Sequence, residues 1–167
     1  KPNAGHHALA AFASRRPGVL TIVSQNVDDM HQRAGNVDTI RLHGDILRDQ
    51  WLRPCAKSTA CAVTQAVAGT PPRCADCGNL VRPGVVWFGE MLPSVAIDAA
   101  EQAASACDVM LVVGTSGAVW PAAGLAEVAC RAGAQVVIVN PSASEIDDAA
   151  HLLLRGTVAE LLPRLFG

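Results

Sequence analysis

Four polar side chains of the types that proton transfer and ligand binding require lie in one short stretch of the sequence: Gln25, Asn26, Asp28 and His43. Two amides and a carboxylate can hydrogen-bond a polar ligand, and an imidazole can donate or accept a proton near neutral pH. A lone histidine in such a stretch is also compatible with a structural role. If the four side chains converge in the fold, they form a site that holds a polar ligand beside a proton acceptor.

Two short apolar segments are expected to position these side chains. Val19 to Val23 is β-branched and apolar and runs directly into Ser-Gln-Asn-Val-Asp-Asp, which is typical of a buried parallel strand with polar residues at its carboxyl end. A second strand, Thr39 to Leu42, ends in His43-Gly44, where the glycine lets another backbone or a ligand come close. Ligand sites of open α/β sheets lie at such strand ends.

The remaining periodicity predicts alternating strands and helices. Polar caps and apolar spacing favour helices over residues 1–14, 28–34, 94–106, 121–133 and 159–166, and apolar runs favour buried strands over 109–113 and 135–139. Such alternation predicts a parallel sheet with right-handed crossovers and flanking helices. Within these elements His31 is interpreted as a structural histidine, and Cys107 and Cys130 as core residues.

Composition restricts the class of protein. The 167 residues are half hydrophobic, enough for a substantial core, and the net charge of −2 provides no basic surface, so neither nucleic acid nor a membrane is an expected partner. No apolar run reaches the length of a membrane span, and the first residues show no signal-peptide pattern. We expect a cytoplasmic protein with reduced cysteines.

A cysteine-rich stretch from Asp49 to Leu80 interrupts the alternation. Cys74 and Cys77 are separated by two residues and followed by a glycine, a spacing with which two thiolates grip one tetrahedral metal. Their expected partners are Cys55 and Cys61, giving a structural zinc site with no open position for water. The alternative is that Cys55 or Cys61 is only a small packed residue and that apolar contacts hold the module.

Several motifs resemble those of one enzyme family. The stretch QNVDDMHQRAG followed by LHG resembles the central signature of the sirtuins, NAD-dependent protein-lysine deacylases. The resemblance continues, in the family's order, through RPGVVWFGE, GTSGAVWPAAG and VIVNPS, and so covers nearly the whole chain. It implies an α/β fold in which residues 1–47 and 81–167 form a Rossmann-like NAD-binding domain and residues 48–80 a small zinc module.

The resemblance also implies roles for individual residues. His43 is the implied catalytic base, which takes a proton from a ribose hydroxyl so that nicotinamide, O-acyl-ADP-ribose and free lysine are formed. The residues implied to bind NAD are Gln25, Asn26, Asp28, Gly114, Thr115, Ser116, Asn140, Thr157 and Val158. Those implied to bind the acyl-lysine peptide are Val86, Trp87, Phe88, Gly89, Glu90 and Val119. The zinc ligands expected from the cysteine spacing are Cys55, Cys61, Cys74 and Cys77.

Within the peptide motif, Val86 and Glu90 are expected to flank the substrate and Phe88 to line the acyl-lysine tunnel. Alternatively, the motif is a core strand in which Trp87 and Phe88 are buried. The tryptophan makes VVWFGE resemble the branch of sirtuins that removes succinyl and other acidic acyl groups.

The chain departs from the family in two places. The first cysteine pair of the family is usually a second CxxC, and at those positions this chain has Trp51 and Pro54. The family's first strand and glycine-rich phosphate loop, which come before the helix expected at residues 1–14, are absent from the sequence, so the NAD-binding domain is expected to lack its N-terminal part. Two alternatives to an active enzyme therefore stay open: a catalytically silent NAD or ADP-ribose binding module, and a zinc-stapled domain that captures peptides.

Overall fold

The computed structural model describes residues 1–53, 66–67 and 69–167 of the chain. Its helices are α1 (Ala4–Arg15), α2 (Met30–Ala34), α3 (Ser94–Ala106), α4 (Leu125–Arg131) and α5 (Val158–Phe166), with 3-10 turns η2 (Ala122–Gly124) and η3 (Asp147–Ala149). Its strands are β1 (Val23–Ser24), β2 (Ile40–Arg41), β3 (Gly44–Trp51), β4 (Ala66–Val67), β5 (Arg73–Cys74), β6 (Val81–Val85), β7 (Val109–Val113), β8 (Gln135–Val139) and β9 (Leu152–Leu154). Among the described residues, none of the helices combines the length and the apolar character that crossing a membrane requires.

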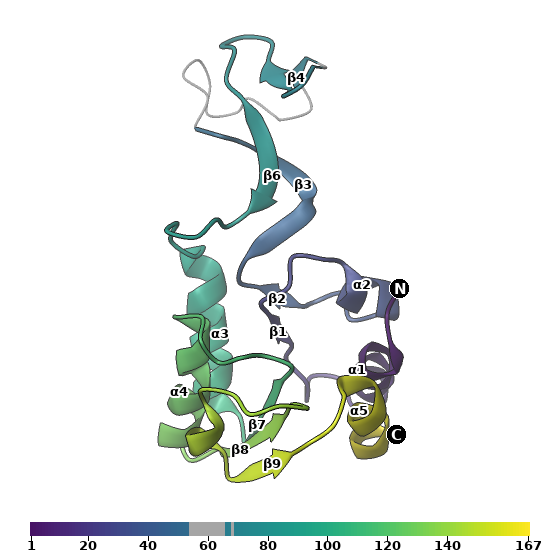
Figure 1. Cartoon of the computed structure of the whole chain (residues 1–167). Helices are drawn as coiled ribbons and strands as arrows, with labels where there is room; N and C mark the ends of the chain where they lie inside the picture. Colours follow the sequence, from purple (N-terminus) through teal and green to yellow (C-terminus); the bar gives the residue numbers. More distant parts are fainter. Residues whose placement is uncertain (54–65, 68) are drawn as a thin grey trace.

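The parallel strands lie in two ladders, which confirms the expected α/β class. β1 pairs with β2, with Ser24 opposite Arg41, and β7, β8 and β9 form a three-stranded sheet in that order (Figure 1). In the larger ladder Val113 lies opposite Val139, and Val139 opposite Leu154. Because both ladders are parallel, each brings the carboxyl ends of its strands to one edge.

One hydrophobic cluster joins the two ladders. Leu42, directly after β2, is fully buried and belongs to the same cluster as Ala100 and Ala104 of α3 and Leu125 and Ala129 of α4. The alanines have small side chains, so α3 and α4 can pack closely, and the two helices lie side by side in Figure 1. The position of His43 is therefore fixed by a buried neighbour in the common core.

The first and last helices pack together. The rings of Phe12 and Phe166 lie 4.9 Å apart in an edge-to-face arrangement, and a guanidinium nitrogen of Arg15 donates to the backbone oxygen of Phe166. Asn3 is the N-cap of α1, and its side chain accepts from the N–H of His6 at 3.1 Å. α5 thus holds α1, which in turn packs against α2 beside His43.

An antiparallel ribbon of β3 and β6 extends away from the parallel ladders and leads to β4 (Figure 1). Pro83 and Gly84 lie inside β6. Proline is tolerated there because β6 has β3 as its one partner in the described chain. The pairing also shifts register between Asp45 and Asp49, opposite these residues, as in a β-bulge.

Other strands also differ from expectation, and β3, β4 and β5 were not predicted. β1 includes only Val23 of the predicted segment, because the ladder with β2 begins there and Val19 is exposed. β7 is only half-buried, because it is an edge strand of its sheet, whereas β8 in the centre is buried. β9 was not predicted. The five predicted helices are all present, with bounds shifted by up to three residues and the fourth starting as η2.

Candidate active site

His43 lies where the two short parallel strands end. The N–H of the preceding Leu42 donates to the carbonyl oxygen of Ser24 at 3.0 Å, so the chain continues in register beyond the ladder. The Nδ1 atom of His43 lies 2.8 Å from the backbone oxygen of Gln25. A carbonyl oxygen can only accept, so Nδ1 carries the proton of this bond. In the neutral imidazole the Nε2 atom then keeps its lone pair and is the ring's proton acceptor.

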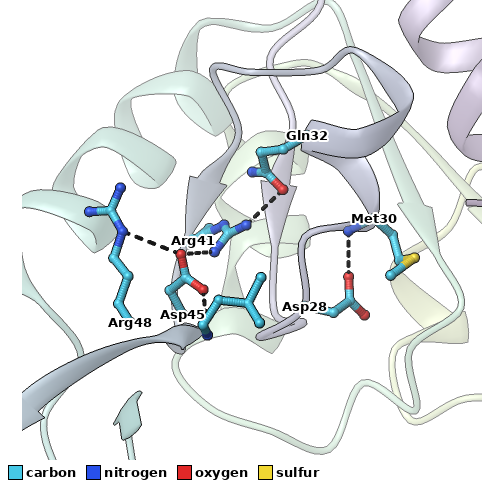
Figure 2. Close-up of polar contacts among 7 residues, drawn as sticks. Asp28, Met30, Gln32, Arg41, Asp45 and Arg48 are labelled. Carbon is cyan, nitrogen blue, oxygen red and sulfur yellow. Dashed lines mark hydrogen bonds and ion pairs between the residues drawn. The ribbon is translucent and has the colours of Figure 1, made fainter. Parts of the chain in front are cut away.

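The loop after β1 carries the other predicted polar residues. Ser24 is buried, and its hydroxyl oxygen accepts from the N–H of Asn26 at 3.1 Å, which leaves the Asn26 side chain exposed. The Oδ1 atom of Asp28 accepts from the N–H of Met30, the first residue of α2, at 2.9 Å (Figure 2). Gln25, Asn26 and Asp28 thus follow β1 directly and stand at the same strand ends as His43.

An ion-pair network that the sequence analysis missed surrounds the His43 turn (Figure 2). Arg41 and Asp45 lie two residues either side of His43, and Nη1 of Arg41 is 2.5 Å from Oδ2 of Asp45. These side chains are only 17% and 21% exposed. Arg41 also donates to Oε1 of Gln32 at 2.7 Å, and Arg48 approaches the same Asp45 oxygen at 3.5 Å. The available signal was an arginine and an aspartate four residues apart around LHG.

Gly44 brings the β3–β6 ribbon against this turn. Its φ is 85°, in the left-handed region, and a Cβ atom there would lie 2.1 Å from the backbone oxygen of Gly84. Next to this contact, the N–H of Val86 donates to the carbonyl oxygen of His43 at 3.0 Å. The backbone of the implied catalytic residue is therefore hydrogen-bonded to the first residue of the implied peptide-binding segment.

The segment from Val86 to Glu90 is a surface turn. Trp87 is 50% exposed and Phe88 fully exposed, so the alternative interpretation as a buried core strand is wrong. The N–H of Glu90 donates to the oxygen of Trp87 at 2.9 Å, and Gly89, with φ 87°, occupies the position that requires a left-handed backbone in a type II turn. A hollow of about 330 Å³ beside this turn is lined by residues of β3, β6 and the turn itself, among them Gly44, Val86 and Glu90.

A second set of predicted residues gathers at the end of the larger ladder. Gly114 follows β7 and Asn140 follows β8, and Nδ2 of Asn140 donates to the backbone oxygen of Thr115 at 2.8 Å. The hydroxyl oxygens of Thr115 and Ser116 accept from the N–H groups of Gly117 and Ala118 at 3.2 and 3.3 Å. Within the described residues both hydroxyl protons and the side-chain oxygen of Asn140 make no hydrogen bond, and this donor and acceptor set fits a ribose or its phosphate.

Thr157 and Val158 lie at the start of α5. The Thr157 hydroxyl donates to Oε2 of Glu160 at 2.7 Å, and this helix cap lowers the pKa of the Glu160 carboxyl. Val158 fills the space between the first turn of α1 and the end of β7, because Cβ atoms added at Gly5 and Gly114 would lie 2.7 and 3.6 Å from its side chain. Val158 therefore lies beside the second set. Val119 is exposed, and its backbone oxygen accepts from the N–H of Ala123 in η2 at 2.9 Å.

Cys74 and Cys77, two of the predicted zinc ligands, lie in a tight turn. The N–H of Cys74 donates to the oxygen of Asn79 at 2.7 Å, and the N–H of Gly78, with φ 70°, donates back to the oxygen of Cys74 at 2.9 Å. Cys55 and Cys61 lie outside the described residues. Within residues 1–53, 66–67 and 69–167, no group of three or more histidines, cysteines or carboxylates is arranged to hold a metal ion.

His31 packs against α1, in keeping with the structural role expected for it. Its ring centroid lies 4.8 Å from that of His6, and its Nδ1 atom is buried without a hydrogen-bond partner in the described part of the chain. Burial lowers the pKa of His31 below its ordinary value, His6 lowers it further, and the charge of Asp28 opposes both. The pKa of His6 is also lowered, mainly by burial.

Comparison with known proteins gives consistent matches. A family model described as the Sir2 family matches residues 1–121. A protein named NAD-dependent protein deacylase from Ralstonia nicotianae is 51% identical over 165 residues, which cover 99% of this chain and 65% of the relative. A protein of the same name from Pyrococcus furiosus is 40% identical over 176 residues, covering 99% of this chain and 67% of the relative.

Solved structures match with the same extent. The structure titled "Sir2-p53 peptide-NAD+" has a TM-score of 0.85 at 35% identity and covers 99% of this chain and 69% of that chain. The structure titled "Sir2 bound to acetylated peptide" has a TM-score of 0.85 at 34% identity and covers 98% of this chain and 69% of that chain. The chain spans 65% of the length of the relative from Ralstonia nicotianae and 66% of the length of a relative from Methylococcus capsulatus.

Proposed function

The chain belongs to the Sir2 family, and on that premise we propose that it carries the chemistry of an NAD-dependent protein-lysine deacylase. The observation that supports this most is the setting of His43: Nδ1 donates to Gln25, Nε2 is left as a proton acceptor, and the backbone oxygen is bonded to Val86. A binding module would not require an imidazole in a defined tautomer between two ligand segments. The names of the relatives, NAD-dependent protein deacylase, support the same reaction class.

In the proposed reaction His43 acts as general base. Bound NAD would supply ADP-ribose as the acceptor of the acyl group: the acyl oxygen would replace nicotinamide on the ribose carbon, and water would replace the lysine nitrogen on the acyl carbon. The role of His43 is to accept, at Nε2, the proton of a ribose hydroxyl, and the bond to Gln25 keeps the ring in the tautomer that can do so. Asn26 is exposed at the strand ends, where its amide suits the nicotinamide carboxamide, and only Oδ1 of Asp28 accepts a hydrogen bond within the described residues, from the N–H of Met30.

The second set of residues suits the adenosine half of NAD. The Asn140 oxygen can accept from a ribose hydroxyl, and the hydroxyl groups of Thr115 and Ser116 can donate, because each uses its oxygen as an acceptor within its own turn. Gly114 is exposed at the end of β7 with φ 61°, and it carries no Cβ that would keep a ligand away from the backbone. Val158 would supply apolar contact beside it.

The acyl-lysine peptide is proposed to bind along the turn from Val86 to Glu90. Extended peptides add to free backbone edges, and their alternate side chains enter pockets. The fully exposed ring of Phe88 is available to cover such a side chain. The direct bond between Val86 and His43 would bring a peptide held here next to the base.

Zinc is proposed to hold residues 48–80 as a module separate from the NAD-binding domain, which comprises residues 1–47 and 81–167. The described half of the site fits a metal, because Cys74 and Cys77 flank a tight turn closed by a left-handed glycine. Cys55 and Cys61 are the proposed remaining ligands. Purified protein should contain one zinc ion per chain, and Cys74→Ser should abolish it; a metal-free protein of unchanged stability would contradict the site.

The proposed activity is tested by nicotinamide release from NAD with acetyl-lysine and succinyl-lysine peptides. The assay should use both the 167-residue chain and the full product of its gene. Release with either peptide supports the proposal, and the ratio of the two rates gives the acyl preference. Stabilisation by NAD without nicotinamide release from the complete protein would contradict it and favour a binding module. The four cysteines of the described residues form no disulfide with one another, which supports a cytoplasmic location that cell fractionation would test.

A further inference from the structure

The peptide-binding turn has little apolar packing to hold it. Trp87 is 50% exposed, Phe88 fully exposed and Met91 almost fully exposed. Buried apolar area is the usual source of order in a loop, and here these side chains supply little of it. Polar contacts must therefore fix the conformation of the turn.

Arg82 supplies contacts from the strand side. Its side chain is only 12% exposed although it carries a charge. Its Nη1 atom donates to the backbone oxygen of Val85 at 2.8 Å, where β6 ends, and its guanidinium lies over the ring of Trp87 at 4.3 Å from the centroid. One guanidinium thus touches both the end of the strand and the first aromatic side chain of the turn.

Glu90 supplies contacts from the other end of the turn. Its two carboxylate oxygens lie 2.7 and 3.0 Å from Nη2 of Arg82, and Oε2 also accepts from the N–H of Trp87 at 2.9 Å. The Trp87 N–H and then the Arg82 guanidinium lower the pKa of the Glu90 carboxyl. The carboxylate is thus occupied by the protein's own groups, and it closes the turn that Gly89 makes possible.

The contacts leave part of the turn free. Within the part of the chain that the structure describes, the N–H and carbonyl of Phe88 make no hydrogen bond. By contrast, the N–H groups of Val86, Trp87 and Glu90 are used within the protein. The turn therefore presents a backbone edge at its tip and is fastened at both ends.

We propose that Arg82 and Glu90 form a clasp that positions the Val86 to Glu90 turn for substrate, so that Glu90 acts on the peptide indirectly and not as a direct contact. The inference rests on the proposed function and deepens its peptide site. Arg82 and Glu90 are positioning residues, because they touch the turn and not the reacting atoms. Opening the clasp should weaken capture of the acyl-lysine peptide and leave NAD binding and His43 chemistry intact.

The test compares Glu90→Ala and Glu90→Gln with Glu127→Ala. Glu127 makes an exposed ion pair with Arg131 on α4, at 3.2 Å, and controls for the loss of a surface charge pair. Glu90→Ala should raise KM for an acetyl-lysine peptide about tenfold, or about 1.4 kcal/mol at 25 °C, with kcat and KM for NAD within about twofold. The KM of Glu90→Gln should fall between those of the wild type and Glu90→Ala, since the amide oxygen can still accept from Arg82 or from the Trp87 N–H but cannot make all three bonds. Glu127→Ala should have the kcat and the KM values of the wild type.

Amide hydrogen exchange gives a readout that does not depend on turnover. In Glu90→Ala the segment 86–91 should lose protection while α3 and β8 keep theirs, and in Glu127→Ala it should stay protected. Unchanged peptide KM together with unchanged exchange in Glu90→Ala would overturn the clasp. A joint fall in melting temperature, kcat and NAD affinity would also overturn it, because the effect would then not be confined to the turn. If the wild-type protein releases no nicotinamide, the proposed function fails, whereas peptide binding and exchange still decide the clasp.

Discussion

The Nδ1 atom of His43 donates a hydrogen bond to the backbone oxygen of Gln25, 2.8 Å away, across the carboxyl ends of β1 and β2. This bond sets the tautomer of the ring without using any side chain of the site. It leaves Nε2 as the basic nitrogen and leaves the Gln25 side chain for a ligand. One backbone oxygen thus orients the imidazole and selects its basic atom.

Two substitutions of His43 separate its hydrogen bond to Gln25 from its basic nitrogen. His43→Asn keeps a donor that can reach the Gln25 oxygen but removes the basic nitrogen, and His43→Ala removes both. We expect nicotinamide-coupled deacylation to fall by a factor of about 10² to 10⁴ in both variants, because general base catalysis is lost. The melting temperature of His43→Asn should stay near that of the wild type. Full turnover in either variant would exclude His43 as the base, and exposed His7→Asn serves as the control.

The ion pair of Arg41 and Asp45 should stabilise the His43 turn more than an ordinary surface pair. Both side chains are largely buried, and Asp45 also accepts from the N–H of Leu47 at 2.9 Å. Asp45→Asn should lower the free energy of unfolding by about 1 to 2 kcal/mol, since a charged hydrogen-bond acceptor is lost from a partly buried site. Glu127→Gln, in the exposed pair of α4, should cost less than about 0.5 kcal/mol. Chemical denaturation measures both, and equal values would contradict the difference in burial.

Gly44 should tolerate no side chain. A Cβ atom would lie 2.1 Å from the backbone oxygen of Gly84, and φ is 85°. Gly44→Ala should cost about 3 kcal/mol or more, as overpacking adds to the penalty for a left-handed backbone. Gly18→Ala is the matched control, because φ is 79° but nothing lies within 4 Å, so only about 1 kcal/mol is expected. Similar denaturation midpoints for the two variants would show that the β3–β6 ribbon is not closely packed there.

The strand ends of the site could be predicted because their signal is local. An apolar run followed at once by polar residues marks the end of a parallel strand, and this placed Gln25, Asn26 and His43 correctly at one edge. The same holds for Gly114 and Asn140, which follow β7 and β8. Parallel pairing then brings residues that are distant in sequence to a common edge without further information.

The contacts that fasten the site could not be predicted in this way. Arg82 meets Glu90 only because a turn at Gly89 reverses the chain, and no periodicity signals such a meeting. β3 mixes exposed aspartates and arginines with apolar residues over a bulge, so neither alternation nor a continuous apolar run was visible. Leu152–Leu154 in β9 is too short for any period to be resolved.

The stability of the chain should fall as the pH is lowered below about 6.5, the ordinary pKa of histidine. Burial lowers the pKa of His31 and of His6, so the folded state stays neutral at these rings while the unfolded chain takes up protons. The free energy of unfolding is therefore unaffected by these two histidines above the ordinary pKa of histidine. It falls as the pH drops from that value toward the lowered pKa values of the folded state. His31→Gln should reduce the slope of the denaturation midpoint against pH between about pH 7 and 5. An unchanged slope in that variant would show that His31 is as easily protonated in the folded protein as in the unfolded chain.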